Sequence, residues 1–329
     1  MFGEKGRKFG NIWHGFGKAW RARSLAKARP RFLERIPPSP SPGPREPFSR
    51  GPYEAIVMIR SVAVAFAAAL VLAPSPLFAQ TADPALAAIV GGPERDAANS
   101  ARDRYRHPEA TLSFFGVKPD SVVVEILPGG SGYWTEILAP YLKDHGRYIA
   151  AVGDRASTSQ EAQKNIAAFT AKFVAAPERY GAIEVTQFSG DKYPIAAPGS
   201  ADFVLTFRNI HNWMAAGEAE AAFKTFYNAL KPGGVLGLEE HRARADQPQD
   251  PLAKSGYVRE DFAIALAESV GFKLAGQSEI NANPKDTKDY SAGVWALPPT
   301  FRLKDVDRDK YAAIGESDRF TLKFVKPSN

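Results

Sequence analysis

The chain contains no cysteine among its 329 residues. This absence excludes disulfides, thiolate metal sites and cysteine nucleophiles. Histidine is scarce too, and its five copies are spread along the chain as His14, His107, His145, His211 and His241. They do not show the i, i+4 or clustered spacing that is typical of metal ligands on one element, so we expect no metal site.

The chain after residue 57 also has no excess of basic over acidic residues. The formal net charge is +6, but residues 1–57 hold 12 Lys and Arg against 4 Glu, which leaves 30 basic and 32 acidic residues elsewhere. Nucleic-acid binding usually needs a basic groove with interleaved aromatics. We therefore expect no nucleic-acid partner.

The first 79 residues resemble a leader more than a folded domain. Residues 1–57 are rich in Arg, Lys and Pro, so we expect a disordered basic extension, which is not translated if synthesis begins at Met58. Residues 58–79 combine Arg60, a short apolar stretch and Ala79 in the layout of a signal peptide. The apolar stretch is shorter than the roughly 20 residues that span a membrane. We expect an exported protein, periplasmic or secreted, with no stable membrane span after cleavage.

Residues 80–329 have the pattern of one α/β domain. Short apolar strands such as 121–126 alternate with amphipathic helices, which is typical of a mostly parallel sheet covered on both faces. The expected strands are 121–126, 148–152, 183–188, 203–208, 235–239, 273–280 and 320–325. The expected helices are two short ones within 94–115, then 134–142, 159–176, 218–230 and 259–270. The pattern predicts a Rossmann-like doubly wound sheet, whose ligands bind at the carboxyl ends of the strands.

Two segments at those carboxyl ends carry candidate ligand-binding residues. The first strand ends near Glu125, and Gly129, Gly130 and Gly132 follow in the turn to the helix, where glycines allow close approach of backbone N–H groups to a ligand. Asp154 follows the second strand, where a carboxylate can accept hydrogen bonds from both ribose hydroxyls of a nucleoside.

A polar and aromatic cluster, Arg-Asn-Ile-His-Asn-Trp, follows the fourth strand at residues 208–213. A histidine in this position is a candidate general base, which makes His211 and its neighbour Asn209 the candidate catalytic residues.

The stretch Leu-Lys-Pro-Gly-Gly at residues 230–234 stops a helix and leads directly into a strand. It resembles the stretch before the fifth strand of class I S-adenosylmethionine-dependent methyltransferases, and the turn after Glu125 resembles their motif I, with Leu127 where the first glycine is expected. The resemblance covers about residues 105–280 and the final strand.

The resemblance implies S-adenosylmethionine as the cofactor and methyl transfer to a small or unknown acceptor. It places Glu125, Gly129, Gly130 and Gly132 beside the methionine end of the cofactor, Asp154 on its ribose, and Asp191 on its adenine. It also implies that the acceptor approaches near Asn209 and His211, and that the last two strands form an antiparallel hairpin. The connection between them, at about 281–311, is long enough for a lid, although a plain surface excursion fits equally well.

Two other functions stay open. Gly130-Ser131-Gly132 partly fits the dinucleotide motif of nicotinamide-dependent oxidoreductases, with Thr135 in place of its third glycine. An exported, non-catalytic ligand-binding protein with the same fold is the second alternative, since S-adenosylmethionine is made in the cytoplasm and fold alone does not establish function.

Overall fold

The computed structural model describes residues 83–328. The expected basic extension, 1–57, and the expected signal peptide, 58–79, lie outside the described residues. No helix within 83–328 combines the length and the apolar character needed to cross a membrane.

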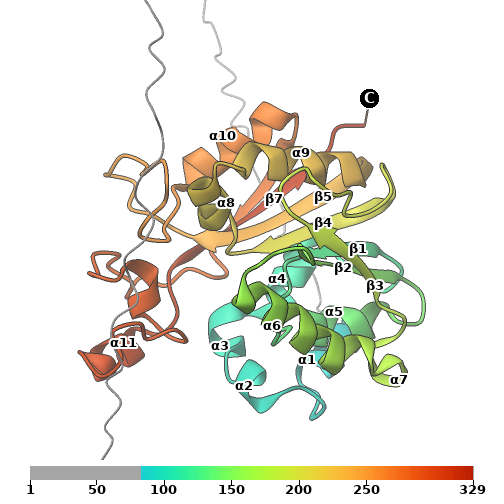
Figure 1. Cartoon of the computed structure of the whole chain (residues 1–329), viewed down its shortest axis with the longest axis horizontal. Helices are drawn as coiled ribbons and strands as arrows, with labels where there is room; N and C mark the ends of the chain where they lie inside the picture. The colour runs from blue at the N-terminus through green and yellow to red at the C-terminus, as the bar shows by residue number, and fades with distance from the viewer. Residues whose placement is uncertain (1–82, 329) are drawn as a thin grey trace, which may run out of the picture. The chain divides into compact units, whose positions relative to one another are not determined.

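A seven-stranded sheet forms the centre of the domain (Figure 1). Its strands are β1 (Val122–Ile126), β2 (Arg147–Gly153), β3 (Glu184–Phe188), β4 (Ala201–Phe207), β5 (Leu230–His241), β6 (Lys273–Ser278) and β7 (Arg319–Val325). Their order is β3-β2-β1-β4-β5-β7-β6. The pairs among β1 to β5 are parallel, whereas β7 runs antiparallel to both β5 and β6. The predicted Rossmann-like sheet with an antiparallel last strand is confirmed.

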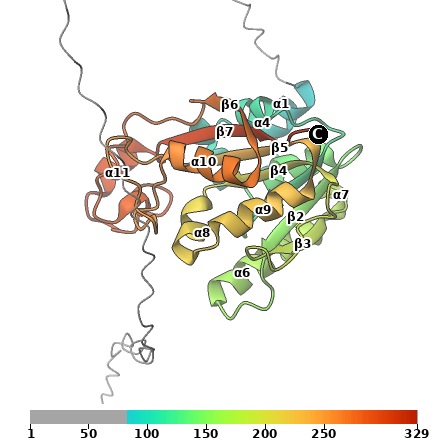
Figure 2. The same ribbon diagram turned by 90° about the horizontal axis from the view of Figure 1, so that it is seen from above.

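Helices cover both faces of the sheet, as predicted (Figures 1 and 2). One face packs on α1 (Pro84–Val90), α4 (Pro108–Phe115), α5 (Thr135–Leu142), α6 (Gln160–Phe169) and α7 (Pro177–Tyr180). The other face packs on α8 (Ile210–Ala216), α9 (Ala219–Ala229) and α10 (Glu260–Val270). In β1, Val123 enters the first core while Val124 and Ile126 enter the second, because successive side chains of a strand point to opposite faces. A strand buried on both faces must be apolar almost throughout, which explains the sequence Val-Val-Val-Glu-Ile.

Three local predictions differ from the structure. The region expected to hold two short helices forms α2 (Ala97–Ser100), α3 (Asp103–Arg106) and α4, because His107 adopts a φ of +39° and Pro108 starts a new helix. The helix expected at 159–176 changes after α6 into a five-residue π-helix, η1 (Thr170–Val174). No helix was predicted directly after β4, but the structure has helix α8 there, with Trp213 and Met214 buried in the core.

The connection between β6 and β7, residues 279–318, has a small structure of its own. It contains η2 (Gly293–Ala296) and α11 (Arg308–Ile314), the latter seen at the edge of the domain in Figure 1. Ala296, Leu297 and Tyr311 form a separate hydrophobic cluster within it. The connection is therefore an ordered subdomain.

Candidate functional site

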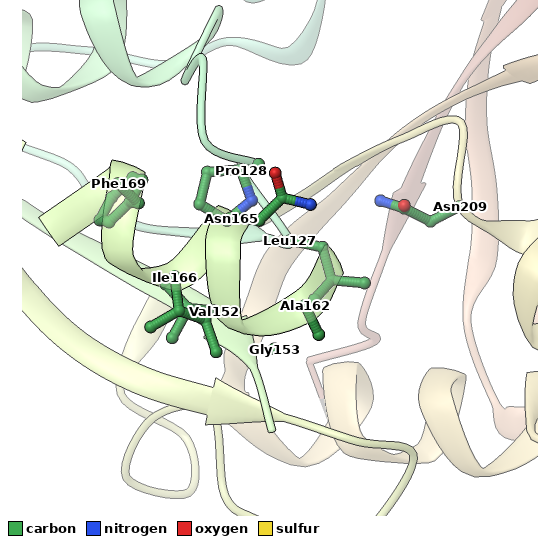
Figure 3. Close-up of a pocket in the computed structure, with 10 residues that line it drawn as sticks. Leu127, Pro128, Val152, Gly153, Ala162, Asn165, Ile166, Phe169 and Asn209 are labelled. Carbon is green, nitrogen blue, oxygen red and sulfur yellow. The ribbon is translucent and has the colours of Figure 1, made fainter. Parts of the chain in front are cut away.

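A pocket of about 290 Å³ lies at the carboxyl ends of β1, β2 and β4 (Figure 3). Strand β1 pairs with β2 on one side and with β4 on the other, so the strand order reverses here. We call this the switch-point pocket. It is lined by Leu127, Pro128, Gly129, Val152, Gly153, Ala162, Asn165, Ile166, Phe169 and Asn209. Open α/β sheets bind their ligands at this position.

The turn after β1 keeps the backbone of a glycine-rich loop although its first expected glycine is absent. Leu127 stands at that place with a φ of +52°, in the left-handed region that a leucine rarely adopts. Its backbone N–H donates to the carbonyl of Ala151 at 2.9 Å, which holds the turn against β2. A strained residue beside a ligand pocket is common in functional sites, where the surrounding structure maintains it.

The three predicted glycines of this turn have different surroundings. Gly129 lines the switch-point pocket, and a Cβ added there would meet no atom within 4 Å. A Cβ on Gly130 would lie 3.0 Å from the Cβ of Ala168, and one on Gly132 would lie 2.3 Å from the Phe173 ring. Only Gly129 therefore borders the pocket, whereas Gly130 and Gly132 allow close packing of the turn on α6 and η1.

Glu125 does not line the switch-point pocket and is only 2% exposed. Its Oε2 accepts hydrogen bonds from Tyr148 at 2.5 Å and from Thr135 at 3.1 Å. Burial raises the pKa of Glu125 to about 7, although these two hydrogen bonds lower it. In this structure Glu125 joins β1, β2 and α5, and its side chain does not border the pocket.

Asp154 follows Gly153 at the end of β2, where a ribose anchor was predicted. Its Oδ2 accepts a hydrogen bond from Lys192 at 2.7 Å, and its Oδ1 accepts from the backbone N–H of Ala156 at 2.8 Å and from the Tyr193 hydroxyl at 3.1 Å. Lys192 in particular lowers the pKa of this carboxyl below its ordinary value. A ribose would have to share these oxygens with Lys192 or displace it.

Asp191 is exposed on the loop after β3 and does not line the switch-point pocket. Its neighbours Lys192 and Tyr193 are the loop residues that reach Asp154. The structure thus brings the Asp191 loop to the predicted ribose position but leaves the Asp191 carboxylate at the surface.

Asn209 lies between β1 and β4 with its side chain directed towards the switch-point pocket, across from Asn165 (Figure 3). Its Nδ2 lies 3.2 Å from the Thr206 hydroxyl and 3.4 Å from the carbonyl of Ile126. These two contacts hold the carboxamide at the carboxyl ends of both strands, and its Oδ1 accepts no hydrogen bond from residues 83–328.

A second, more polar cavity of about 270 Å³ lies next to Asn209. It is lined by Arg208 and His211, which lie on either side of Asn209 in the sequence. We call it the arginine pocket. The other residues that line it are Arg102, Arg106, His241, Val294, Trp295, Pro298, Pro299, Thr300, Glu316 and Ser317. Seven of these, from Val294 to Ser317, belong to the connection between β6 and β7. The two pockets are thus joined by residues 208–211.

His211 and His241 meet in this pocket, although they are far apart in the sequence. His211 Nδ1 lies 3.1 Å from Glu240 Oε1, and His241 Nδ1 lies 2.6 Å from the Ser317 hydroxyl. One ligand atom from each of His211, Glu240 and His241 lies within 4.8 Å of the others, close enough to surround a metal ion. The fold therefore brings together two histidines that are far apart in the sequence, and the expected absence of a metal site stays a prediction.

The charge around these histidines nevertheless opposes a bound cation. Burial and the neighbouring charges of His211 and Arg208 hold the pKa of His241 well below its ordinary value. The same positive field would repel a metal ion. Glu240 is fully buried and accepts the backbone N–H of His241 at 2.8 Å in addition to its contact with His211. A histidine that is oriented by a buried carboxylate is suited to accept a proton from a bound substrate.

Sequence reasoning missed Glu240, His241 and the arginines of the second pocket. The signal for the first two was Glu-Glu-His at the end of the fifth strand, because the carboxyl ends of all parallel strands meet at one edge. The arginines carry no such signal, since Arg102 and Arg106 lie about a hundred residues before Arg208.

Together, the sheet order and the pocket define a Rossmann-like α/β protein with a cavity at its switch point. No family model matches the chain, and no curated protein matches it. Solved structures similar to it include an S-adenosylmethionine-dependent methyltransferase from Aquifex aeolicus, with 16% identity over 69% of this chain and 93% of that one, at a TM-score of 0.46.

Two further solved structures that are similar to this chain are a cyclase and a second methyltransferase. The cyclase SpnF has 15% identity over 75% of this chain and 92% of its own, at a TM-score of 0.48. Human N-acetylserotonin methyltransferase in complex with S-adenosylmethionine has 13% identity over 70% of this chain and 54% of its own, at a TM-score of 0.44. A shared fold does not by itself fix the reaction.

Proposed function

We propose that this protein transfers a methyl group from S-adenosylmethionine to a small acceptor. The observation that carries the proposal is the junction of two cavities at residues 208–211. Asn209 borders the mostly apolar switch-point pocket, and Arg208 and His211 border the polar pocket beside it. Two ligands bound in neighbouring cavities meet at a fixed point, which is the main requirement for a transfer reaction.

The switch-point pocket has features that suit an adenosyl ligand. Gly129 and Gly153 expose backbone, since a Cβ at either position would meet no atom within 4 Å. Ala162, Ile166 and Val152 give an apolar wall for a flat base, and Asp154 lies one residue beyond the pocket as a ribose acceptor. When bound, S-adenosylmethionine would supply an electrophilic methyl group.

On the acceptor side, His211 and Glu240 form the group that would hold a proton. The fully buried Glu240 carboxylate fixes the ring of His211 through its Nδ1, which leaves Nε2 for a substrate. Asn209 would orient the acceptor through its free Oδ1. Exclusion of water is the other part of such catalysis.

The connection between β6 and β7 is the proposed lid over the acceptor. Trp295, Pro298, Thr300 and Ser317 of this segment line the arginine pocket. Limited proteolysis with and without ligand tests this role, because protection by ligand is expected of a lid and not of a surface excursion. We also propose export, which is supported by the sequence of residues 58–79 alone, and peptide mapping of the native N-terminus tests it.

Calorimetry of the full chain with S-adenosylmethionine, its demethylated product and NAD tests the donor assignment. Binding of both adenosyl compounds without NAD is expected. Preference for NAD would support the oxidoreductase alternative, in which Thr135 replaces the third glycine of the dinucleotide motif. The structure places the Thr135 hydroxyl 3.1 Å from Glu125 and 2.9 Å from Tyr148, in the core behind the turn.

One observation favours the non-catalytic alternative. The carboxylate of Asp154 already accepts hydrogen bonds from Lys192, Tyr193 and Ala156, so this site is partly occupied by its own side chains. A folded protein that binds neither adenosyl compound would replace the methyltransferase proposal with that of an exported binding protein.

A further inference from the structure

We propose that the arginine pocket binds an oxyanion, either a carboxylate or a phosphate ester, and that this oxyanion belongs to the methyl acceptor. The acceptor role rests on the proposed function, whereas the binding of an anion does not.

Three guanidinium groups line the pocket from separate parts of the fold. Arg102 lies between α2 and α3, Arg106 ends α3, and Arg208 follows β4. A fourth, Arg319 at the start of β7, lies directly behind them and is 1% exposed. Side chains that converge on one cavity from the two ends of α3 and from the end of β4, about a hundred residues later, form a built site rather than a solvated charged face.

The carboxylates nearby do not balance these charges. Glu316 accepts hydrogen bonds from Arg102 at 2.6 Å, Arg319 at 3.0 Å and Arg106 at 3.2 Å. Glu239 lies 3.3 Å from Arg319 and 3.6 Å from Arg208. Four guanidinium groups thus face two carboxylates.

Glu240, the third carboxylate of the region, is engaged by His211. An excess of at least one positive charge remains even when Glu240 is counted. Buried charge without a counter-charge is costly, and a bound anion would remove that cost.

Two titratable groups report the same positive field. Burial alone would raise the pKa of Glu316, but Arg106, Arg319 and Arg102 lower it to about 2. Burial and the adjacent positive charges lower the pKa of His241. The arginine charges that keep Glu316 ionised despite its burial would also favour an anionic ligand.

Arg208 supplies a donor without a partner. Its Nη1 is buried and makes no hydrogen bond within residues 83–328, because Glu239 Oε1 at 3.6 Å is too distant. The backbone of Arg208 is held at a φ of +61°, which is unusual for a residue other than glycine. Buried polar atoms of native proteins nearly always have a partner, so the unpaired Nη1 shows that the arginines of this region have more donors than the acceptors of residues 83–328 satisfy.

The remaining walls indicate the body of the ligand. Trp295, Pro298 and Pro299 give the pocket an apolar side, and the ring of Trp295 is fixed by the Arg302 guanidinium 4.3 Å from its centroid. The volume of about 270 Å³ is near the lower end of small-molecule pockets. The ligand class is therefore a small oxyanion with a flat or apolar body.

The experiment uses the full chain and three probes of similar shape: benzoate, phenyl phosphate and the uncharged benzamide. Calorimetry at low salt measures each affinity in the wild type, in Arg102→Gln and in Arg208→Gln. Arg102 is the gentler position, since Glu316 keeps Arg106 and Arg319 as partners when Arg102 is lost. Arg147→Gln is the matched control, because Arg147 pairs with Glu184 in an exposed ion pair at the start of β2.

We expect at least one anion to bind at millimolar concentration or below, and benzamide to bind at least tenfold more weakly. Each pocket variant should lose about tenfold in anion affinity, which corresponds to about 1.4 kcal/mol, while Arg147→Gln should not change. Whichever anion binds more tightly distinguishes a carboxylate from a phosphate ester.

Absence of anion binding by the folded wild type, equal binding of benzamide, or unchanged affinity in both pocket variants would overturn the inference. Should the variants not fold, NMR of the wild type decides: the ring protons of His211 and His241 should shift with the anion, while those of the exposed His145 should not. Shifts at none of the three, or equally at all three, would also overturn it.

Separate titration with S-adenosylmethionine distinguishes the two proposals. Donor binding without anion binding would overturn this inference alone. Anion binding without donor binding would overturn the proposed function, and with it the acceptor role of the anion.

Discussion

Gly129 and Gly132 lie in the same turn after β1, yet substitution by alanine should affect two different properties of the protein. Both glycines have positive φ, +70° and +55°. A Cβ at Gly129 would enter open space beside the switch-point pocket, whereas a Cβ at Gly132 would lie 2.3 Å from two ring carbons of Phe173. Phe173 is fully buried, so its ring cannot move into solvent.

The expected magnitudes follow from these surroundings. An alanine in the left-handed region costs about 1–2 kcal/mol at either position. Overpacking against a buried ring adds about 1–3 kcal/mol at Gly132 alone. For a domain of this size each kcal/mol corresponds to roughly 2–4 °C in Tm. Gly132→Ala should therefore melt several degrees below Gly129→Ala.

Thermal denaturation followed by circular dichroism measures this difference, and calorimetry with S-adenosylmethionine measures the second one. Gly129→Ala should keep most of its stability but bind the donor more weakly, because its methyl group narrows the pocket. For Gly132→Ala, assayed below its Tm, the loss in the free energy of S-adenosylmethionine binding should be smaller than the loss in the free energy of unfolding. Equal melting temperatures for the two variants would refute the assignment of Gly132 to packing.

Three other predictions concern single side chains. Asp154→Ala should weaken S-adenosylmethionine binding roughly ten- to a hundredfold with little change in Tm, and Lys192→Met should strengthen it by freeing the carboxylate; calorimetry measures both, and an unchanged affinity in Asp154→Ala excludes it as the ribose anchor. The pKa of Glu125 is about 7 when folded against an ordinary 4.5, so the unfolded state loses this proton first. Stability measured by urea unfolding should fall as the pH rises from about 4.5 to about 7, and a Glu125→Gln variant with the same slope would contradict this. His211→Gln should leave the affinity for S-adenosylmethionine within about twofold of the wild type while abolishing most acceptor methylation. A large loss of donor affinity would mean that His211 belongs to the donor pocket and not to the acceptor pocket.

The sheet could be predicted from the sequence because its strands and helices carry strong local patterns. Strands such as Val122–Ile126 are short, apolar and separated by helical segments, so type and order follow from burial on both faces. Boundaries were less predictable. Helix α8 was missed because it is only seven residues long, and the burial of Trp213 that stabilises it depends on residues far along the chain.

The candidate site was predictable only where it follows the chain locally. The turn after β1 and the residues after β4 were found because each directly follows a strand. The hydrogen bond that Tyr148 donates to Glu125 depends on the register of β1 with β2, and the ion pair of Asp154 with Lys192 depends on how the loop after β3 folds back. Such contacts between distant residues leave no local periodicity.

Residues 208–211 explain how one short segment can serve two cavities. At Arg208 the backbone has a φ of +61° and its N–H donates to the carbonyl of Glu239 at 2.7 Å, so the chain turns sharply at the end of β4 while staying attached to β5. This turn directs the Arg208 and His211 side chains to one pocket and that of Asn209 to the other. A residue in a regular conformation at 208 would extend β4 and separate these side chains. A strained backbone conformation of this kind costs about 1–3 kcal/mol. The conformation of Arg208 keeps the side chains of residues 208–211 divided between the two pockets.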